Sequence, residues 1–137
     1  MAVNIGDVVL VNYLDFDNEM TTGLFLVYSV DNYWLSTLKS FSAIKICSKP
    51  QSFQVKLDQK QFKFLDHTSY ANCICQHKFR EDQIKSTLGV VNTFILNCVK
   101  KQLTNMNKDI DEQLDTTINH YNRVARAINT KYVTMGE

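Results

Sequence analysis

The sequence has few of the residues that interrupt regular structure and none of the long apolar stretches that cross a membrane. Its 137 residues include four glycines and one proline, and neither type occurs from Val90 to Met135. No run of about 18 apolar residues is present, and residues 1–20 contain neither a basic leader nor a long apolar core. We therefore expect a cytoplasmic protein with no membrane span.

Positive charge is missing from the first part of the chain. No Lys or Arg occurs among residues 1–38, where five Asp and Glu residues give a charge of −5. Because the whole chain carries +1, residues 39–137 carry +6. The phosphates of a nucleic acid would have to be met by cations of this later part.

The cysteines lack the spacing of a metal site. Four are present, and the closest pair is Cys73-x-Cys75, with no CxxC motif and no nearby pair of histidines. We expect these thiols to be reduced and to act as small apolar residues. The sequence therefore predicts no metal site and no cofactor.

Residues 7–76 have the pattern of a small β domain. Short apolar or alternating segments are separated by turns, which is typical of a barrel rather than of β-α-β units. Val8–Val11 is apolar at every position, so this strand should be buried on both faces. The predicted strands are Asp7–Tyr13, Leu24–Val30, Phe41–Cys47, Phe53–Leu57 and Tyr70–Gln76.

A helical pattern follows Gly89. From Ile95 to Ile128 an apolar stripe, continued through Thr117, makes nine steps over thirty-three residues, a mean of about 3.7 residues per step. We expect a break at Thr104–Asn107, where the residues are weak helix formers, and a second helix capped by Asn107. This second helix would either fold back as a brace or dock on a partner.

Five short segments carry a resemblance to a known family. They are Gly6–Val11, Leu26-Val27, Ile44–Ser48, Phe53–Leu57 and Tyr70–Gln76. Their order and spacing resemble the PemK/MazF family of toxins from toxin–antitoxin systems. The resemblance covers residues 4–104 and places a short helix at Glu81–Leu88 and an amphipathic helix from Asn92.

The resemblance implies a mainly β fold with C-terminal helices. A small SH3-like barrel, as in plasmid-maintenance toxins, would be followed by an extended helical segment. We expect residues 1–104 to form the barrel with the family's C-terminal helix, and residues 105–137 to form an added extension packed on it or on a partner. An extension folded back over the substrate groove would act as a built-in antitoxin.

The resemblance also implies an activity. Members of the family are mostly endoribonucleases that use no metal and direct the ribose 2′-hydroxyl at the neighbouring phosphate. This reaction needs a base, a proton donor and a cation or hydrogen-bond donor for the developing negative charge. The resemblance therefore implies that this chain cleaves single-stranded mRNA as a homodimer and that an antitoxin neutralises it.

The family's phosphate-stabilising arginine has no counterpart in this chain. Its position falls on Gly23, or on Thr22 if the register shifts by one residue, and the loop before it offers no cation. The family threonine that positions the phosphate falls on Ser48, which keeps the hydroxyl. Three further family positions, a Gln, an Arg and an Asp, fall on Gln76, Lys78 and Glu81.

Other residues are candidates to replace the missing arginine. The segment His77–Arg80 combines titratable, cationic and aromatic side chains, which suits the binding of a base and a phosphate, although such a segment is also typical of a solvated turn. The catalytic candidates are Ser48, His77, Lys78 and Arg80. The substrate-binding candidates are Lys49, Gln76, Glu81, Tyr33 and Trp34.

An acidic loop leaves an alternative function open. The partner-binding candidates are Asp15, Phe16, Asp17 and Glu19, which would present phosphate-like charge and an aromatic ring to a basic partner. The chain would then be a catalytically silent barrel that binds and inhibits a protein. A nucleic-acid-binding regulator without cleavage is a third reading. The sequence favours the endoribonuclease.

Overall fold

A computed structural model describes residues 2–31 and 39–135, with side chains described as far as residue 125. The chain divides into two compact units, residues 1–103 and residues 104–137. Among the described residues, no helix combines the length and the apolar character that crossing a bilayer requires.

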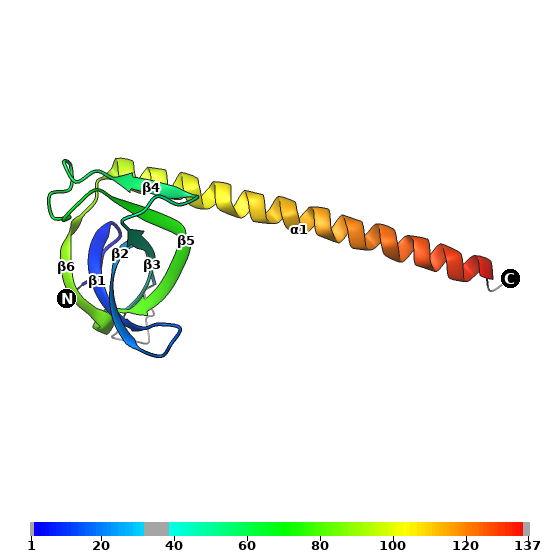
Figure 1. Ribbon diagram of the computed structural model, residues 1–137, viewed down its shortest axis with the longest axis horizontal. Coiled ribbons are helices and arrows are strands. Elements are labelled where there is room, and N and C mark those ends of the chain that lie inside the picture. The colour runs from blue at the N-terminus through cyan, green and yellow to red at the C-terminus, as the bar shows by residue number, and fades with distance from the viewer. Residues whose placement is uncertain (1, 32–38, 136–137) are drawn as a thin grey trace. The chain divides into compact units, whose positions relative to one another are not determined.

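The first unit is built on one antiparallel sheet with the strand order β4-β5-β3-β2-β1-β6. The sheet curls on itself, as Figure 1 shows. The predicted mainly β fold is thereby confirmed. The elements are β1 (Asp7–Leu14), β2 (Met20–Asp31), β3 (Ser40–Cys47), β4 (Gln54–Leu57), β5 (Ser69–Arg80), the 3₁₀ turn η1 (Glu81–Gln83), β6 (Ile84–Val90) and α1 (Thr93–Met135).

Both faces of the sheet carry apolar residues, because successive side chains of a strand point to opposite sides. On one face, Leu26 and Ile44 pack with Phe62 of the β4–β5 connection and with Ile95 of α1. The opposite face carries a second cluster that includes Val9, Val11, Phe25, Val27, Phe41, Ala43 and Phe79.

β1 lies inside the sheet, between β2 and β6. Val8 belongs to the cluster beside α1, whereas Val9 and Val11 belong to the opposite cluster, and all three are fully buried. The prediction that this apolar run is buried on both faces is confirmed. Gly6 precedes the strand with φ of 96°, a conformation that glycine adopts without strain, and its N–H donates to the Val27 carbonyl at 2.8 Å.

β5 is irregular where it pairs with β3. Ile44 lies opposite Gln76, whereas the next residue, Lys45, lies opposite Asn72. One step along β3 therefore corresponds to four steps along β5, and the segment 73–75 has no opposite residue on β3. Extra residues of this kind bend a strand and change where its side chains point.

The predicted helix at Glu81–Leu88 is wrong. Only Glu81–Gln83 form a helical turn, and the chain then continues as β6, which pairs with β1 from Asp7↔Val90 to Val11↔Ile84. Ile84, Thr87 and Val90 are β-branched residues, which favour a strand over a helix. The free edge of β1 supplies the partner that this segment needs.

The predicted break at Thr104–Asn107 is also wrong, because α1 is one helix from Thr93 to Met135. The Asn92 side-chain oxygen accepts the Ile95 N–H at 3.0 Å and caps its start. An Asn in a helix costs no more than about 0.7 kcal/mol relative to Ala. A break would sacrifice several backbone hydrogen bonds, so the expected C-terminal helices form a single helix.

Candidate functional site

One face of the sheet gathers a histidine, a lysine and several aromatic rings. Residues directly opposite each other on neighbouring strands point to the same side. Lys45 lies opposite Phe25, and His77 lies opposite Ala43. Phe25 and Ala43 belong to the same buried cluster, so Lys45 and His77 share its face.

Aromatic rings surround His77 on this face. Its imidazole is parallel to the Phe79 ring, with centroids 5.5 Å apart, and it meets the edge-on Phe25 ring at 5.2 Å. The Tyr13 ring lies 5.8 Å from the imidazole on the side of β1. Three strands, β1, β2 and β5, therefore hold the imidazole in place.

The environment of His77 favours its neutral form. Partial burial lowers the pKa of the imidazole most, and the nearby positive charge of Lys45 lowers it further. A neutral imidazole at neutral pH can accept a proton, as a general base must.

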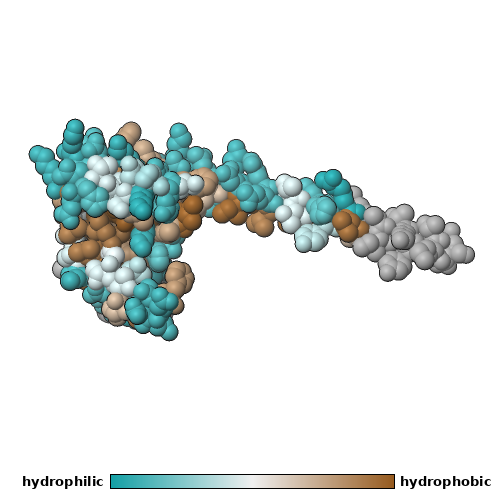
Figure 2. Space-filling model, viewed as in Figure 1, coloured by the Kyte–Doolittle hydropathy of each residue, from teal (hydrophilic) through white to brown (hydrophobic). Residues whose placement is uncertain are grey.

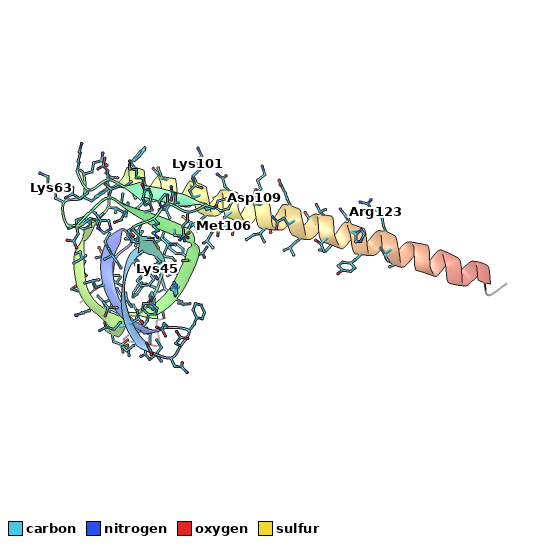
Figure 3. All side chains as sticks on the ribbon, in the orientation of Figure 1. Lys45, Lys63, Lys101, Met106, Asp109 and Arg123 are labelled. Carbon is cyan, nitrogen blue, oxygen red and sulfur yellow. The ribbon has the colours of Figure 1, made fainter. Side chains whose placement is uncertain are left out.

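Lys45 is a candidate that sequence reasoning missed. Its neighbours Ile44 and Ile46 are buried in the cluster beside α1, so the lysine between them points to the other face. Figure 3 labels Lys45 among the strands of the sheet. The alternation Phe41, Ala43, Lys45 along β3 was the available signal, because it continues an inward-facing apolar row with one cation.

No protein-family profile matches this sequence, and no curated protein matches it. Among solved structures, the fold is similar to that of an endoribonuclease in complex with its cognate antitoxin from mycobacterial species, with a TM-score of 0.56. The identity is 18%, over 76% of this chain and 93% of that chain. The chain therefore has the kind of fold that the PemK/MazF resemblance predicted. The predicted barrel fold is thus confirmed, and at this identity the likeness concerns the fold alone.

The position at which the PemK/MazF resemblance places an arginine is closed by aromatic rings. A Cβ atom added to Gly23 would lie 2.8 Å from a Phe25 ring carbon and 3.1 Å from a Tyr13 ring carbon. Thr22, the position reached by a shift of one residue, is exposed and donates its hydroxyl hydrogen to Asn12 Oδ1 at 2.7 Å. Neither position supplies a cation.

The structure does not bring all of the predicted catalytic residues together. Ser48 follows the end of β3, five residues beyond Ala43, the residue opposite His77. At about 3.3 Å per residue, this separation is roughly 16 Å along the strand. Arg80 lies opposite Ser40, at the other end of β3. Lys49 is exposed beside Ser48.

Lys78 and Arg80 point away from His77, because neighbouring residues of a strand alternate in direction. Lys78 Nζ lies 2.8 Å from Asp31 Oδ2, and Arg80 Nε lies 3.2 Å from Asp82 Oδ1. Both cations are exposed on the outer surface of β5.

The remaining predicted substrate contacts are dispersed. Gln76 accepts the Tyr28 hydroxyl at 3.1 Å and donates to the Cys73 carbonyl at 3.1 Å. A Glu81 carboxylate oxygen accepts the Val3 N–H at 3.1 Å. Tyr33 and Trp34 lie outside the described residues.

The acidic loop is an ordered hairpin connection between β1 and β2. The Asp15 carboxylate accepts the N–H groups of Asp17 and Glu19 at 2.9 and 3.0 Å and the Thr21 hydroxyl at 2.9 Å. These bonds, led by that from Glu19, lower the pKa of Asp15. Phe16 is fully exposed, at 106%. The loop therefore presents an aromatic ring between carboxylates.

A cavity of about 300 Å³ opens elsewhere in the first unit. It is lined by Leu10, Leu24, Phe64, Leu65, Asp66, His67, Ser69 and Leu88. The Ser69 hydroxyl donates to the His67 carbonyl at 3.0 Å, so it is not aimed at the imidazole. Among the described residues, no cluster of His, Cys, Asp and Glu could hold a metal ion.

Proposed function

We propose that this chain is a toxin-type endoribonuclease, acting as a homodimer, that cleaves single-stranded mRNA without a metal and is neutralised by an antitoxin. Its fold supports this proposal, since the similar solved structure is an endoribonuclease bound to its cognate antitoxin. The observation that carries the proposal is the placement of His77 and Lys45 on one aromatic face.

The chemistry divides between these two side chains. The neutral imidazole of His77 takes the proton of the ribose 2′-hydroxyl, whose oxygen attacks the adjacent phosphorus. The Lys45 ammonium stabilises the extra negative charge on the phosphoryl oxygens. The bond to the 5′-oxygen then breaks and that oxygen takes a proton from water. The hydroxide formed takes the proton from the His77 imidazolium, which restores the neutral base, and a 2′,3′-cyclic phosphate remains.

Aromatic rings and outlying polar groups complete the proposed site. Tyr13 would stack on a nucleobase next to the scissile phosphate, because a phenol ring offers a flat apolar face to any base. Ser48 and Lys49, exposed beyond the end of β3, would contact the same RNA further along the strand.

A cleavage assay tests this proposal. Purified protein and a mixed-sequence single-stranded RNA are incubated with EDTA, and fragments are checked for 2′,3′-cyclic phosphate ends. Lys45→Met and His77→Gln should each lower the rate at least about 100-fold, the usual cost of losing a positioned base or charge donor. Lys78→Met removes a cation from the opposite face and is the matched control, with a change of less than about threefold.

Two results would contradict the nuclease. One is intact RNA at micromolar protein together with normal growth of cells that express the chain. The other is cleavage that Lys78→Met lowers as much as Lys45→Met does, because the reaction would then lie on the outer face.

The acidic hairpin supports a second candidate, a catalytically silent protein that binds a basic partner. The observation that favours it is the fully exposed Phe16 on a loop held by the Asp15 carboxylate. An ordered aromatic ring beside carboxylates is suited to a cationic protein surface. If RNA stays intact and a cellular effect disappears with Phe16→Ala/Asp17→Asn, this second function holds.

A further inference from the structure

The second unit presents an unpartnered apolar stripe. Five side chains spaced by three or four residues along α1 are 43–68% exposed: Ile110, Leu114, Ile118, Tyr121 and Val124. Residues at this spacing lie on one side of a helix. Figure 2 shows apolar residues along one side of the helix. Single exposed apolar residues are ordinary, but a continuous row indicates a contact surface.

The spacing of the stripe is that of a helix that pairs with another helix. From Leu114 the steps alternate between three and four residues, through Thr117 and Tyr121 to Val124, which is the a/d pattern of a coiled coil. Thr117 suits this pattern because its hydroxyl donates to the Gln113 carbonyl at 2.9 Å. Its polar atom is therefore satisfied within its own helix.

The charges of this segment are separated along the helix axis. Between positions 109 and 131 the four carboxylates lie first, at Asp109, Asp111, Glu112 and Asp115, and the cations follow, at Arg123 and in the sequence at positions 126 and 131. Lys108 directly precedes the carboxylates, and the acidic part still carries a net negative charge. Figure 3 labels Asp109 and Arg123 at different levels of α1. Two parallel copies would set like charges side by side, whereas two antiparallel copies set the acidic part of each beside the basic part of the other.

One antiparallel register satisfies both patterns. With a two-fold axis at Asn119, residues whose numbers add to 238 lie level with each other, so that Leu114 meets Val124 and Thr117 meets Tyr121 of the second copy. The acidic part of each copy then lies along the basic part of the other. Each apolar layer then pairs an a position with a d position. We propose that the helical segment 110–124 is a self-association surface that pairs antiparallel with the same segment of a second copy of this chain.

Cysteine cross-linking in the full chain reads this register directly. Leu114→Cys and Val124→Cys proteins are prepared separately, mixed, allowed to exchange and oxidised mildly, and the joined peptides are identified by mass spectrometry. The mixed 114–124 disulfide should exceed either same-residue disulfide at least tenfold, because only level positions bring Cα atoms within disulfide range. Wild-type protein oxidised in the same way shows which disulfides come from the native cysteines.

A matched control tests whether cross-linking depends on the apolar side of the helix and not only on the level of the two residues along it. Asp115→Cys and Arg123→Cys satisfy the same sum but lie about 100° around the helix from Leu114 and Val124, away from the seam. This pair should cross-link at least tenfold less. Tyr121→Asp, introduced at an exposed position, should lower the 114–124 yield at least tenfold without loss of helical circular dichroism.

Several outcomes would overturn the proposal. Predominant same-residue disulfides would mean parallel pairing. Equal yields from the 115–123 control would mean random collision. Absence of any cross-link in the purified protein would mean that the stripe binds a different protein or none.

Discussion

The imidazole of His77 lies parallel to the ring of Phe79, with 4° between the planes and 5.5 Å between the centroids. The two residues are separated by one position on β5 and therefore project from the same side of the strand. The phenyl ring is one of the groups packed around the partly buried imidazole, and burial lowers the pKa of His77. A purely apolar side chain thus takes part in setting the protonation state of the candidate base.

The titration of His77 should respond to this neighbour. Burial, the largest cause, and then the charge of Lys45 lower its pKa. Phe79→Leu should therefore move the pKa upward toward the ordinary value of about 6.5. Lys45→Met should move it in the same direction by a smaller step. Both shifts are measurable by NMR titration of the imidazole protons, with Phe62→Leu in the other cluster as the control.

The lowered pKa also fixes the sign of a stability effect. Below about pH 6.5 the unfolded chain binds a proton at His77 more readily than the folded chain does. The contribution of His77 to the free energy of unfolding is therefore lost as the pH falls through its folded pKa. Wild type should lose more unfolding free energy than His77→Gln between pH 7.5 and pH 5. Urea titrations measure both values. Equal losses of unfolding free energy in the two proteins would mean that the protonation of His77 does not affect stability.

Gly23→Ala should lower the free energy of unfolding. The new methyl group would meet the Phe25 ring at 2.8 Å, and overpacking of this kind costs about 1–3 kcal/mol. Thr22→Ala, on the exposed side of the same strand, should change stability by no more than about 0.5 kcal/mol. Denaturant unfolding of the two variants measures the difference, and an unchanged Gly23→Ala would mean that the ring moves aside without cost.

Asp15→Ala should loosen the acidic hairpin without unfolding the barrel. The carboxylate accepts the backbone N–H groups of Asp17 and Glu19, so hydrogen exchange at these two amides should become faster. Because the folded pKa of Asp15 is lowered, its support of the loop is complete above about pH 3.9 and is lost as pH falls through the folded pKa. Asp15→Asn keeps one acceptor oxygen and should give an intermediate rate.

Cys73 should be the slowest of the four thiols to react with iodoacetamide. It is fully buried, and burial raises its pKa to about 11, so little thiolate is present at pH 8. Cys75 and Cys98 are half-buried and should be labelled first. Mass spectrometry after timed labelling ranks the sites, and equal rates in urea provide the control. Early labelling of Cys73 would show that this part of β5 opens readily.

The sequence was most informative where a local pattern and the final packing agree. Val8–Val11 is apolar at every position and is indeed covered on both faces. The break at Thr104–Asn107 was mispredicted because weak helix propensities are small beside the continuous hydrogen bonding of α1. β6 was missed because its stability comes from β1, which lies more than seventy residues earlier in the chain.

The candidate site was harder to predict than the fold. His77 was a candidate from its sequence context, but Lys45 becomes its neighbour only through the register of β3 with β2 and β5. The closure of Gly23 by Tyr13 and Phe25 is likewise a tertiary relationship, because the two rings reach it from different strands. A sequence states which residues alternate, but the pairing of strands decides which of them meet.

The number of residues in the irregular segment 73–75 of β5 decides which side of the sheet His77 faces. This segment inserts an odd number of residues relative to β3, so the part of the strand that follows it has its inward and outward positions exchanged. Deleting or duplicating one residue there would turn the imidazole to the outer surface and bring Lys78 inward, although no side chain of the candidate site had been altered. The length of this segment therefore decides which side chains of β5 reach the candidate site, as strictly as their identity does.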